Sequence, residues 1–146
     1  MRVRTRISAD YPEMEVHVCN YEMNESVKEV AARIERAVND TIAGTDENGI
    51  RLLPVCEIVR FYACNQKVLA QHKDGSYSVH SKLYELEEQL DEKQFVRISK
   101  SEIVNIRKIK KLDMDMAGTI RIVLSDGTQT YTSRRCIPRL KKALGI

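Results

Sequence analysis

Apolar and polar residues alternate along the first part of the chain. In residues 1–8 valine, threonine and isoleucine alternate with arginine, and a second alternation runs over residues 14–18. Period 2 is typical of a strand with one buried face, and Tyr11-Pro12 interrupts the pattern between the two segments. We therefore predict two strands that pair as a hairpin or lie next to each other in a small sheet.

The period changes to that of a helix after Asn24. Ser26 and Glu29 have the spacing of a capping box, in which each side chain binds a free backbone N–H of the first turn. The pattern predicts an amphipathic helix of about four turns that ends near Asp40. By default its narrow apolar stripe covers the N-terminal strands, and pairing with the same helix of a second chain is the alternative. The stripe consists of Val27, Val30, Ala31, Ile34 and Val38.

After Asp40 the pattern predicts mostly strands. Three dipeptides between β-favouring runs predict tight hairpins, because they tolerate the positive φ of a type I′ turn. They are Asn48-Gly49, Asp74-Gly75 and Asp126-Gly127. The flanking strands are predicted at 41–45 with 50–53, at 68–72 with 77–80 and at 119–125 with 128–132, and further extended segments at 58–64, 95–99, 103–105 and 109–114. Helical spacing predicts a short helix over 81–90 with Ser81 as N-cap, and a last helix over 138–144.

Length and composition limit the class of protein. The chain has 146 residues, of which 42% are hydrophobic and 31% charged, so we expect one globular domain with a small appendage. No apolar run has the ~20 residues that a membrane span needs, and the N-terminus lacks the apolar stretch of an export signal. We expect a cytoplasmic protein whose four cysteines are reduced.

The charge is distributed unevenly along the chain. Residues 1–48 carry six Lys and Arg against ten Asp and Glu, whereas residues 49–146 carry eighteen against eleven, which gives the second part a net charge of +7. Its basic residues cluster at 97–111 and again at 134–142. One such cluster is usually a solvated face, but two on one small domain favour a polyanionic partner.

The sequence lacks three common catalytic motifs. It has no nucleophile elbow, no phosphate-binding glycine loop and no HExxH metal motif, and its histidines and cysteines lack the spacing of a metal site. Neighbouring carboxylates, as at Asp113 and Asp115, are explained by solvation. We therefore expect no enzyme, no cofactor and no metal.

Three motifs follow one another in the second part of the chain. The helix SKLYELEEQL follows a hairpin, the phrase FVRISKSEIVN follows at Phe95–Asn105, and Ser133-Arg134 precedes a Leu- and Lys-rich end. In this order they resemble the LytTR family of bacterial DNA-binding domains, whose corresponding patterns are sLkeLeekL, F-x-R-I-H-R-S-x-I-V-N and S-R. Ser99 and Lys100 occupy the His and Arg positions of the middle phrase, which is the main departure from the pattern.

The resemblance implies a mainly β fold (α+β overall), an antiparallel LytTR-type domain with one short internal helix and a C-terminal helix. It covers residues 46–146, and residues 1–45 would form a strand–helix appendage that could serve in dimerisation. The implied function is that of a sequence-specific transcriptional regulator, which inserts loops between strands into the grooves of double-stranded DNA, as a homodimer on repeated half-sites.

The residues expected to face DNA lie at three links between elements and in one basic run. Glutamine can read adenine, arginine or lysine can read guanine, and serine can bind phosphate. Lys108, in the run 97–111, is expected to contact phosphate. The full set is Gln66, Lys67, Lys100, Ser101, Lys108, Arg134 and Arg135. Because Ser99 and Lys100 depart from the family pattern, two alternative functions stay open. The protein could be a protein-interaction module or a ligand sensor that has lost DNA binding.

Overall fold

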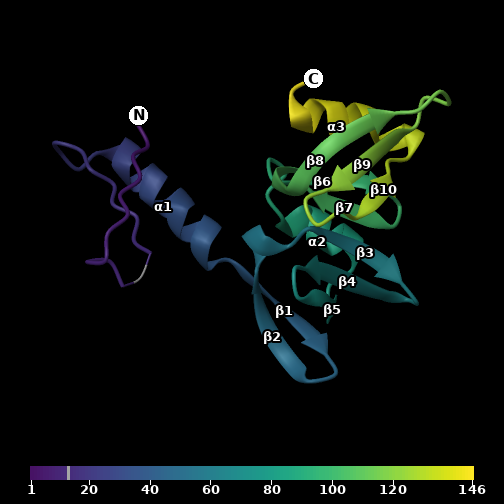
Figure 1. Ribbon diagram of the computed structural model, residues 1–146, viewed down its shortest axis with the longest axis horizontal. Helices are drawn as coiled ribbons and strands as arrows, with labels where there is room; N and C mark the ends of the chain where they lie inside the picture. Colours follow the sequence, from purple (N-terminus) through teal and green to yellow (C-terminus); the bar gives the residue numbers. More distant parts are fainter. Residues whose placement is uncertain (13) are drawn as a thin grey trace. The chain divides into compact units, whose positions relative to one another are not determined.

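The computed structural model describes residues 1–12 and 14–146, and the side chains of residues 36–39 lie outside the described set. The chain forms two compact units, Met1–Ala37 and Val38–Ile146 (Figure 1). The helices are α1 Glu25–Asn39, α2 Leu83–Gln89 and α3 Ile137–Leu144. The strands are β1 Thr41–Asp46, β2 Gly49–Pro54, β3 Arg60–Cys64, β4 Lys67–His72, β5 Gly75–Val79, β6 Phe95–Ser99, β7 Glu102–Asn105, β8 Ile109–Met114, β9 Ile120–Leu124 and β10 Gln129–Tyr131.

The first unit contains α1 and an irregular segment before it. The helix begins where it was predicted, but its cap is Asn24, whose side-chain oxygen accepts the N–H of Val27 at 3.0 Å, and the predicted Ser26 capping box was wrong. Val27, Val30 and Ile34 are half-buried, in agreement with the predicted apolar stripe. Val38, the last predicted member of that stripe, lies outside the described side chains.

The two predicted N-terminal strands do not form. Residues 1–12 and 14–24 contain no strand, and the apolar residues of the alternating pattern are exposed to solvent, among them Ile7 at 93% and Met14 at 96%. A strand is stable only when a neighbouring strand pairs its backbone and a second layer covers its apolar face. In one copy of this chain the described residues of the segment have neither.

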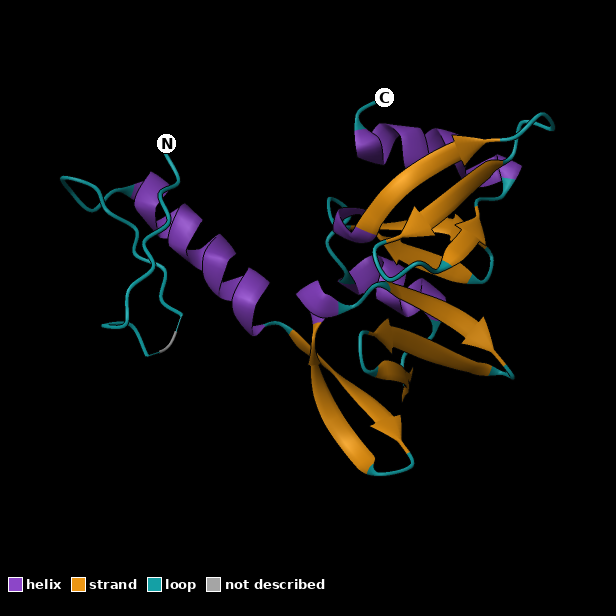
Figure 2. Ribbon diagram, in the orientation of Figure 1, coloured by secondary structure: helices purple, strands orange, loops and turns teal. Residues whose placement is uncertain are grey.

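The second unit is built from two antiparallel sheets and two helices (Figure 2). Its described strands form a larger sheet in the order β2-β1-β5-β4-β3-β7-β6 and a smaller sheet in the order β10-β9-β8. All three predicted hairpins are confirmed, as β1–β2, β4–β5 and β9–β10. Their turns are not of the predicted type I′, because positive φ occurs at Gly49, Gly75 and Gly127 but not at the Asn or Asp before each glycine. The internal helix is confirmed, but Lys82 caps it in place of Ser81, because the Glu85 carboxylate accepts the Lys82 N–H.

Two hydrophobic clusters hold these layers together. The first lies between α2 and the larger sheet and includes Phe61, Leu86, Phe95 and Ile103, and the second joins β6 and β7 to the smaller sheet and α3. Its buried members are Val59, Val96, Ile98, Val104, Ile120, Ile122, Leu124 and Leu140. Neighbouring residues of β6 and β7 therefore belong to different clusters, and both faces of these two strands are buried.

Candidate nucleic-acid interface

The turn between β3 and β4 presents Gln66 and Lys67. Cys64 pairs with Lys67, so Asn65 and Gln66 alone form the loop, and both have positive φ, at 49° and 64°. Two successive positive φ angles are those of a type I′ turn, which matches the twist of the flanking strands. The turn holds the exposed Gln66 side chain at the tip of the hairpin.

The turn between β6 and β7 lies next to the end of β3. Lys100 and Ser101 are exposed in this turn, and the Ser101 carbonyl accepts a hydrogen bond from the Ala63 N–H at 2.8 Å. One residue further along each strand, Tyr62 pairs with Glu102. Since Ala63 lies only two residues before Asn65, the two turns project from the same end of the larger sheet.

The segment after β10 reaches the same end of the domain. The N–H of Ser133 donates to the carbonyl of Ile98 at 2.7 Å, and the Thr132 hydroxyl donates to the same carbonyl at 3.0 Å. Ile98 lies one residue before Ser99, at the end of β6. Arg134 and Arg135 follow Ser133 in a short 3₁₀ helix, Arg134–Cys136, and both are exposed.

Six of the seven predicted residues therefore come from three segments at one end of the domain, which we call the turn edge. It consists of Gln66, Lys67, Lys100, Ser101, Arg134 and Arg135. Lys108 lies elsewhere: it follows β7 at the far end of that strand, and its carbonyl accepts the Ser125 N–H beside the β9–β10 turn.

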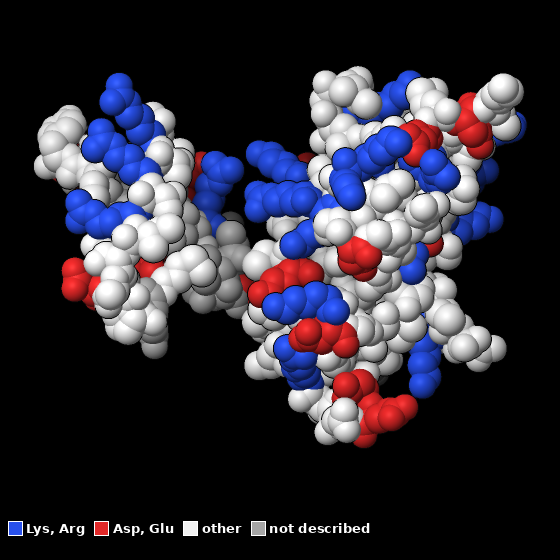
Figure 3. All heavy atoms as spheres, viewed as in Figure 1, with Lys and Arg blue, Asp and Glu red and all other residues white. Residues whose placement is uncertain are grey.

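The cations of the turn edge are available to a ligand. Among the described residues none of the carboxylates forms an ion pair with Lys67, Lys100, Arg134 or Arg135. Arg134 makes one long contact, 3.5 Å, to the carbonyl of Ala117. Figure 3 shows basic side chains scattered over the face formed by the smaller sheet and α3, with a few acidic side chains among them. Exposed cations without carboxylate partners suit a polyanion.

Two arginines that sequence reasoning did not assign stabilise the strands behind the turn edge. Arg60 pairs with Glu102 at 3.2 Å and lies over the ring of Tyr62, and Glu102 also accepts the Thr130 hydroxyl, which links the two sheets. Arg97 binds the β6–β7 turn itself. Period-2 patterns contain no signal for such side-chain contacts.

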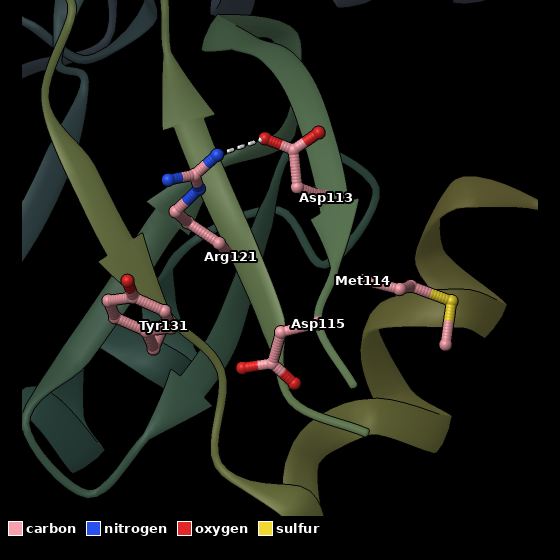
Figure 4. Close-up of a pocket in the computed structure, with 5 residues that line it drawn as sticks. All are labelled: Asp113, Met114, Asp115, Arg121 and Tyr131. Carbon is pink, nitrogen blue, oxygen red and sulfur yellow. Dashed lines mark hydrogen bonds and ion pairs between the residues drawn. The ribbon is translucent and has the colours of Figure 1, made fainter. Parts of the chain in front are cut away.

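A shallow pocket on the outer face of the smaller sheet contains none of the predicted residues (Figure 4). Arg121 donates to Asp113 at 2.6 Å, and this hydrogen bond holds the pKa of the Asp113 carboxyl below its usual value. The charged groups of the pocket are thus largely paired with each other. Asp113, Met114, Asp115, Arg121 and Tyr131 line it.

Neither a metal site nor a membrane helix is found in the part of the chain that the structure describes. No three of its His, Cys, Asp and Glu residues are grouped to hold a metal ion. None of its helices is both long and apolar enough to cross a bilayer.

The second unit is thus a mainly antiparallel β domain whose turns present, at one end, exposed basic side chains that suit a polyanionic ligand. The model of the LytTr DNA-binding domain matches residues 48–145. The chain belongs to the LytTR family, and the prediction of a DNA-binding transcriptional regulator is confirmed.

Two kinds of relatives agree with this assignment. A LytTr DNA-binding domain from Bacillus cereus has the same fold, with a TM-score of 0.70 and 21% identity over 74% of this chain and 99% of that one. Proteins from Staphylococcus aureus strains NCTC 8325 and COL are 34% identical over 100% of this chain and 99% of their own length. Both are named HTH-type transcriptional regulators. In the described part of this chain α2 and α3 do not form a helix-turn-helix, because strands β6 to β10 separate them.

Proposed function

We propose that the turn edge is the surface with which this regulator reads double-stranded DNA. The β3–β4 turn, the β6–β7 turn and the segment after β10 would enter the grooves, in place of a recognition helix. The observation that carries the proposal is the pair of backbone hydrogen bonds, Ala63 to Ser101 and Ser133 to Ile98, that brings three distant segments of the sequence to one end of the domain.

The side chains of the turn edge divide into two roles. Gln66 can pair with the N6 and N7 atoms of adenine, and Arg135 and Lys100 can donate to guanine, so these residues would read bases. Lys67, Ser101 and Arg134 would bind phosphates and fix the position of the domain on the duplex. Lys108 lies away from the turn edge and would contribute little.

Selection from a pool of random duplexes tests this function. The full-length protein should enrich a repeated motif. Its affinity should fall steeply with salt, because each neutralised phosphate releases counterions and lowers log affinity by about 0.9 for each unit of log salt concentration. A pool without enrichment at low salt would contradict the proposal and favour a module that binds an acidic protein.

We also propose that the regulator binds as a homodimer through its first unit. A unit of 37 residues is too small to bury a stable core alone, and below about 40 residues a domain usually needs a partner or a staple. The exposed apolar residues before α1 and the half-buried stripe of α1 would be covered by a second copy. Two domains held in this way suit repeated half-sites, as the selection test would reveal.

Ile34→Asp tests the dimer, because it places a charge on the apolar stripe of α1. The variant should sediment as a monomer while the melting of the second unit stays unchanged. A variant that remains dimeric would rule out α1 as the interface. We place the regulator in the cytoplasm, where its DNA would be, and propose no catalytic activity for it.

A further inference from the structure

The guanidinium of Arg97 is committed to the backbone of the turn that carries Lys100. Its Nε donates to the Ser99 carbonyl at 2.6 Å, and its Nη2 donates to the Lys100 carbonyl at 2.5 Å. The β6–β7 pairing has a register shift between Arg97 and Ser99, directly before this turn. The planar fork of an arginine can bind two successive carbonyls, whereas the single ammonium group of a lysine cannot match that geometry.

A carboxylate on α2 holds Arg97 from the other side. Glu87 accepts the Nη1 of Arg97 at 3.0 Å through one oxygen and the Nη1 of Arg139 at 2.6 Å through the other. Arg139 belongs to α3, which begins directly after the 3₁₀ helix that carries Arg134 and Arg135. One carboxylate therefore connects the β6–β7 turn to the helix that follows the last part of the turn edge.

This arrangement differs from an ordinary surface ion pair. Exposed pairs contribute little, because solvent and salt screen them. The Arg97 side chain is only 17% exposed, and two of its three donating nitrogens bind backbone carbonyls, which do not titrate and do not move independently of the turn. Its contacts fix the peptide planes on both sides of Lys100.

We propose that Arg97 and Glu87 are positioning residues for DNA reading. They hold the Lys100 turn in the conformation that it has when DNA is bound. Through Arg139 they also fix the distance between this turn and the Arg134–Arg135 segment. A turn that is fixed before binding loses less conformational entropy when it binds DNA. A fixed turn also directs the Lys100 side chain to a single base edge. Neither residue touches DNA in this account. The inference rests on the proposed DNA-reading role of the turn edge.

The test compares Arg97→Gln with Arg121→Gln. Both variants lose one positive charge and one ion pair with a carboxylate, but Arg121 lies on the smaller sheet and does not contact the turn. For each variant we would measure the affinity for duplexes selected by the wild-type protein, the affinity for the unselected pool, and the melting temperature. The ratio of the two affinities should fall about tenfold in Arg97→Gln, because one specific base contact is lost. It should stay within about twofold in Arg121→Gln, because that variant loses only a charge remote from the turn.

A double-mutant cycle separates positioning from stability. Lys100→Ala should lower the affinity ratio about tenfold in the wild-type background and less than twofold in the Arg97→Gln background, because a disordered turn no longer directs Lys100. Arg97→Lys keeps the charge but should rescue only part of the ratio. Glu87→Gln should lower the ratio less than Arg97→Gln, since the carbonyl contacts remain.

The outcomes distinguish this inference from the function on which it rests. If the wild-type protein shows no preference for selected duplexes, the proposed function itself fails. If it does, and Lys100→Ala costs the same in both backgrounds, the positioning role is overturned while DNA reading stands. Equal losses in Arg97→Gln and Arg121→Gln would also overturn it, because they would reflect general destabilisation alone.

Discussion

Replacing Gln66 with glycine should stabilise the protein and weaken its DNA binding. Gln66 has a φ of 64°, in the left-handed region, which costs an L-residue roughly 1–2 kcal/mol. Glycine adopts this conformation without strain, but it loses about 0.5–1 kcal/mol more backbone entropy on folding. The net effect of Gln66→Gly should therefore be a gain of roughly 1 kcal/mol, or about 4 °C in melting temperature for a domain of this size.

The same change removes a side chain that we propose reads adenine. Loss of a bidentate base contact costs about 1–3 kcal/mol, which is about 5- to 140-fold in affinity for the selected duplex. Thermal unfolding and fluorescence titration with selected and unselected duplexes would measure both effects. Asn65→Gly is the matched control, because it adds the same flexibility to the same turn, retains Gln66, and relieves less strain in a residue that tolerates the left-handed region.

Either half of this reasoning can be refuted separately. A lower melting temperature in Gln66→Gly would mean that the turn conformation is not strained. An unchanged affinity for the selected duplex would remove Gln66 from the base-reading residues. Equal losses of affinity in Gln66→Gly and Asn65→Gly would assign the effect to turn flexibility.

Three further predictions concern phosphate contacts, base reading and pH. In salt titrations, Lys67→Ala should reduce the slope of log affinity against log salt concentration by about 0.9, whereas Lys108→Ala should leave this slope unchanged. Equal slopes for the two variants would contradict the proposed interface. Arg135→Lys should cost about 1–3 kcal/mol on the selected duplex and little on random DNA, and a preserved ratio would exclude base reading by Arg135. Glu57 accepts a hydrogen bond from His72, which lowers the pKa of the Glu57 carboxyl below its ordinary value of 4.5. The ionised carboxylate therefore stabilises the folded protein above pH 4.5, and this stabilisation is lost as the pH falls through the lowered pKa. Glu57→Gln should therefore lower the melting temperature at pH 7, and the gap to the wild type should close in melts at acidic pH; a constant gap would rule out this linkage.

Most of the second unit could be predicted from the sequence, because its signals are local. Turn dipeptides and period-2 runs define the hairpins directly, and Asp126-Gly127 is an example in which the position of the turn and both strands were predicted together. The N-terminal strands failed for a related reason: alternation reports that a segment can form a strand, but not that it has a partner. The cap at Asn24 was missed because Ser26, with Glu29 three residues later, has the spacing of a capping box, whereas Asn24 has no Glu or Gln at that distance.

The candidate site could be predicted only in part. The positions of Gln66, Lys100 and Arg135 on links between strands followed from the family resemblance, and the structure locates all three links at one end of the domain. The positive φ of Gln66 had no signal, since glutamine is not a residue typical of that region. The contacts of Arg97 with the Ser99 and Lys100 carbonyls lie beside a register shift in the β6–β7 pair, and composition and periodicity encode neither feature.

Strands β6 and β7 are covered on both faces, and this limits how far their sequence can change. On a strand with one solvated face, every second position accepts many residues. Here Phe95 and Ile103 contact one cluster while Val96 and Val104 contact the other, and the buried Asn105 amide donates to the Ile58 carbonyl. A random library over residues 95–105 should thus yield far fewer folded variants than one of equal length over residues 109–119, where β8 leads into an exposed turn.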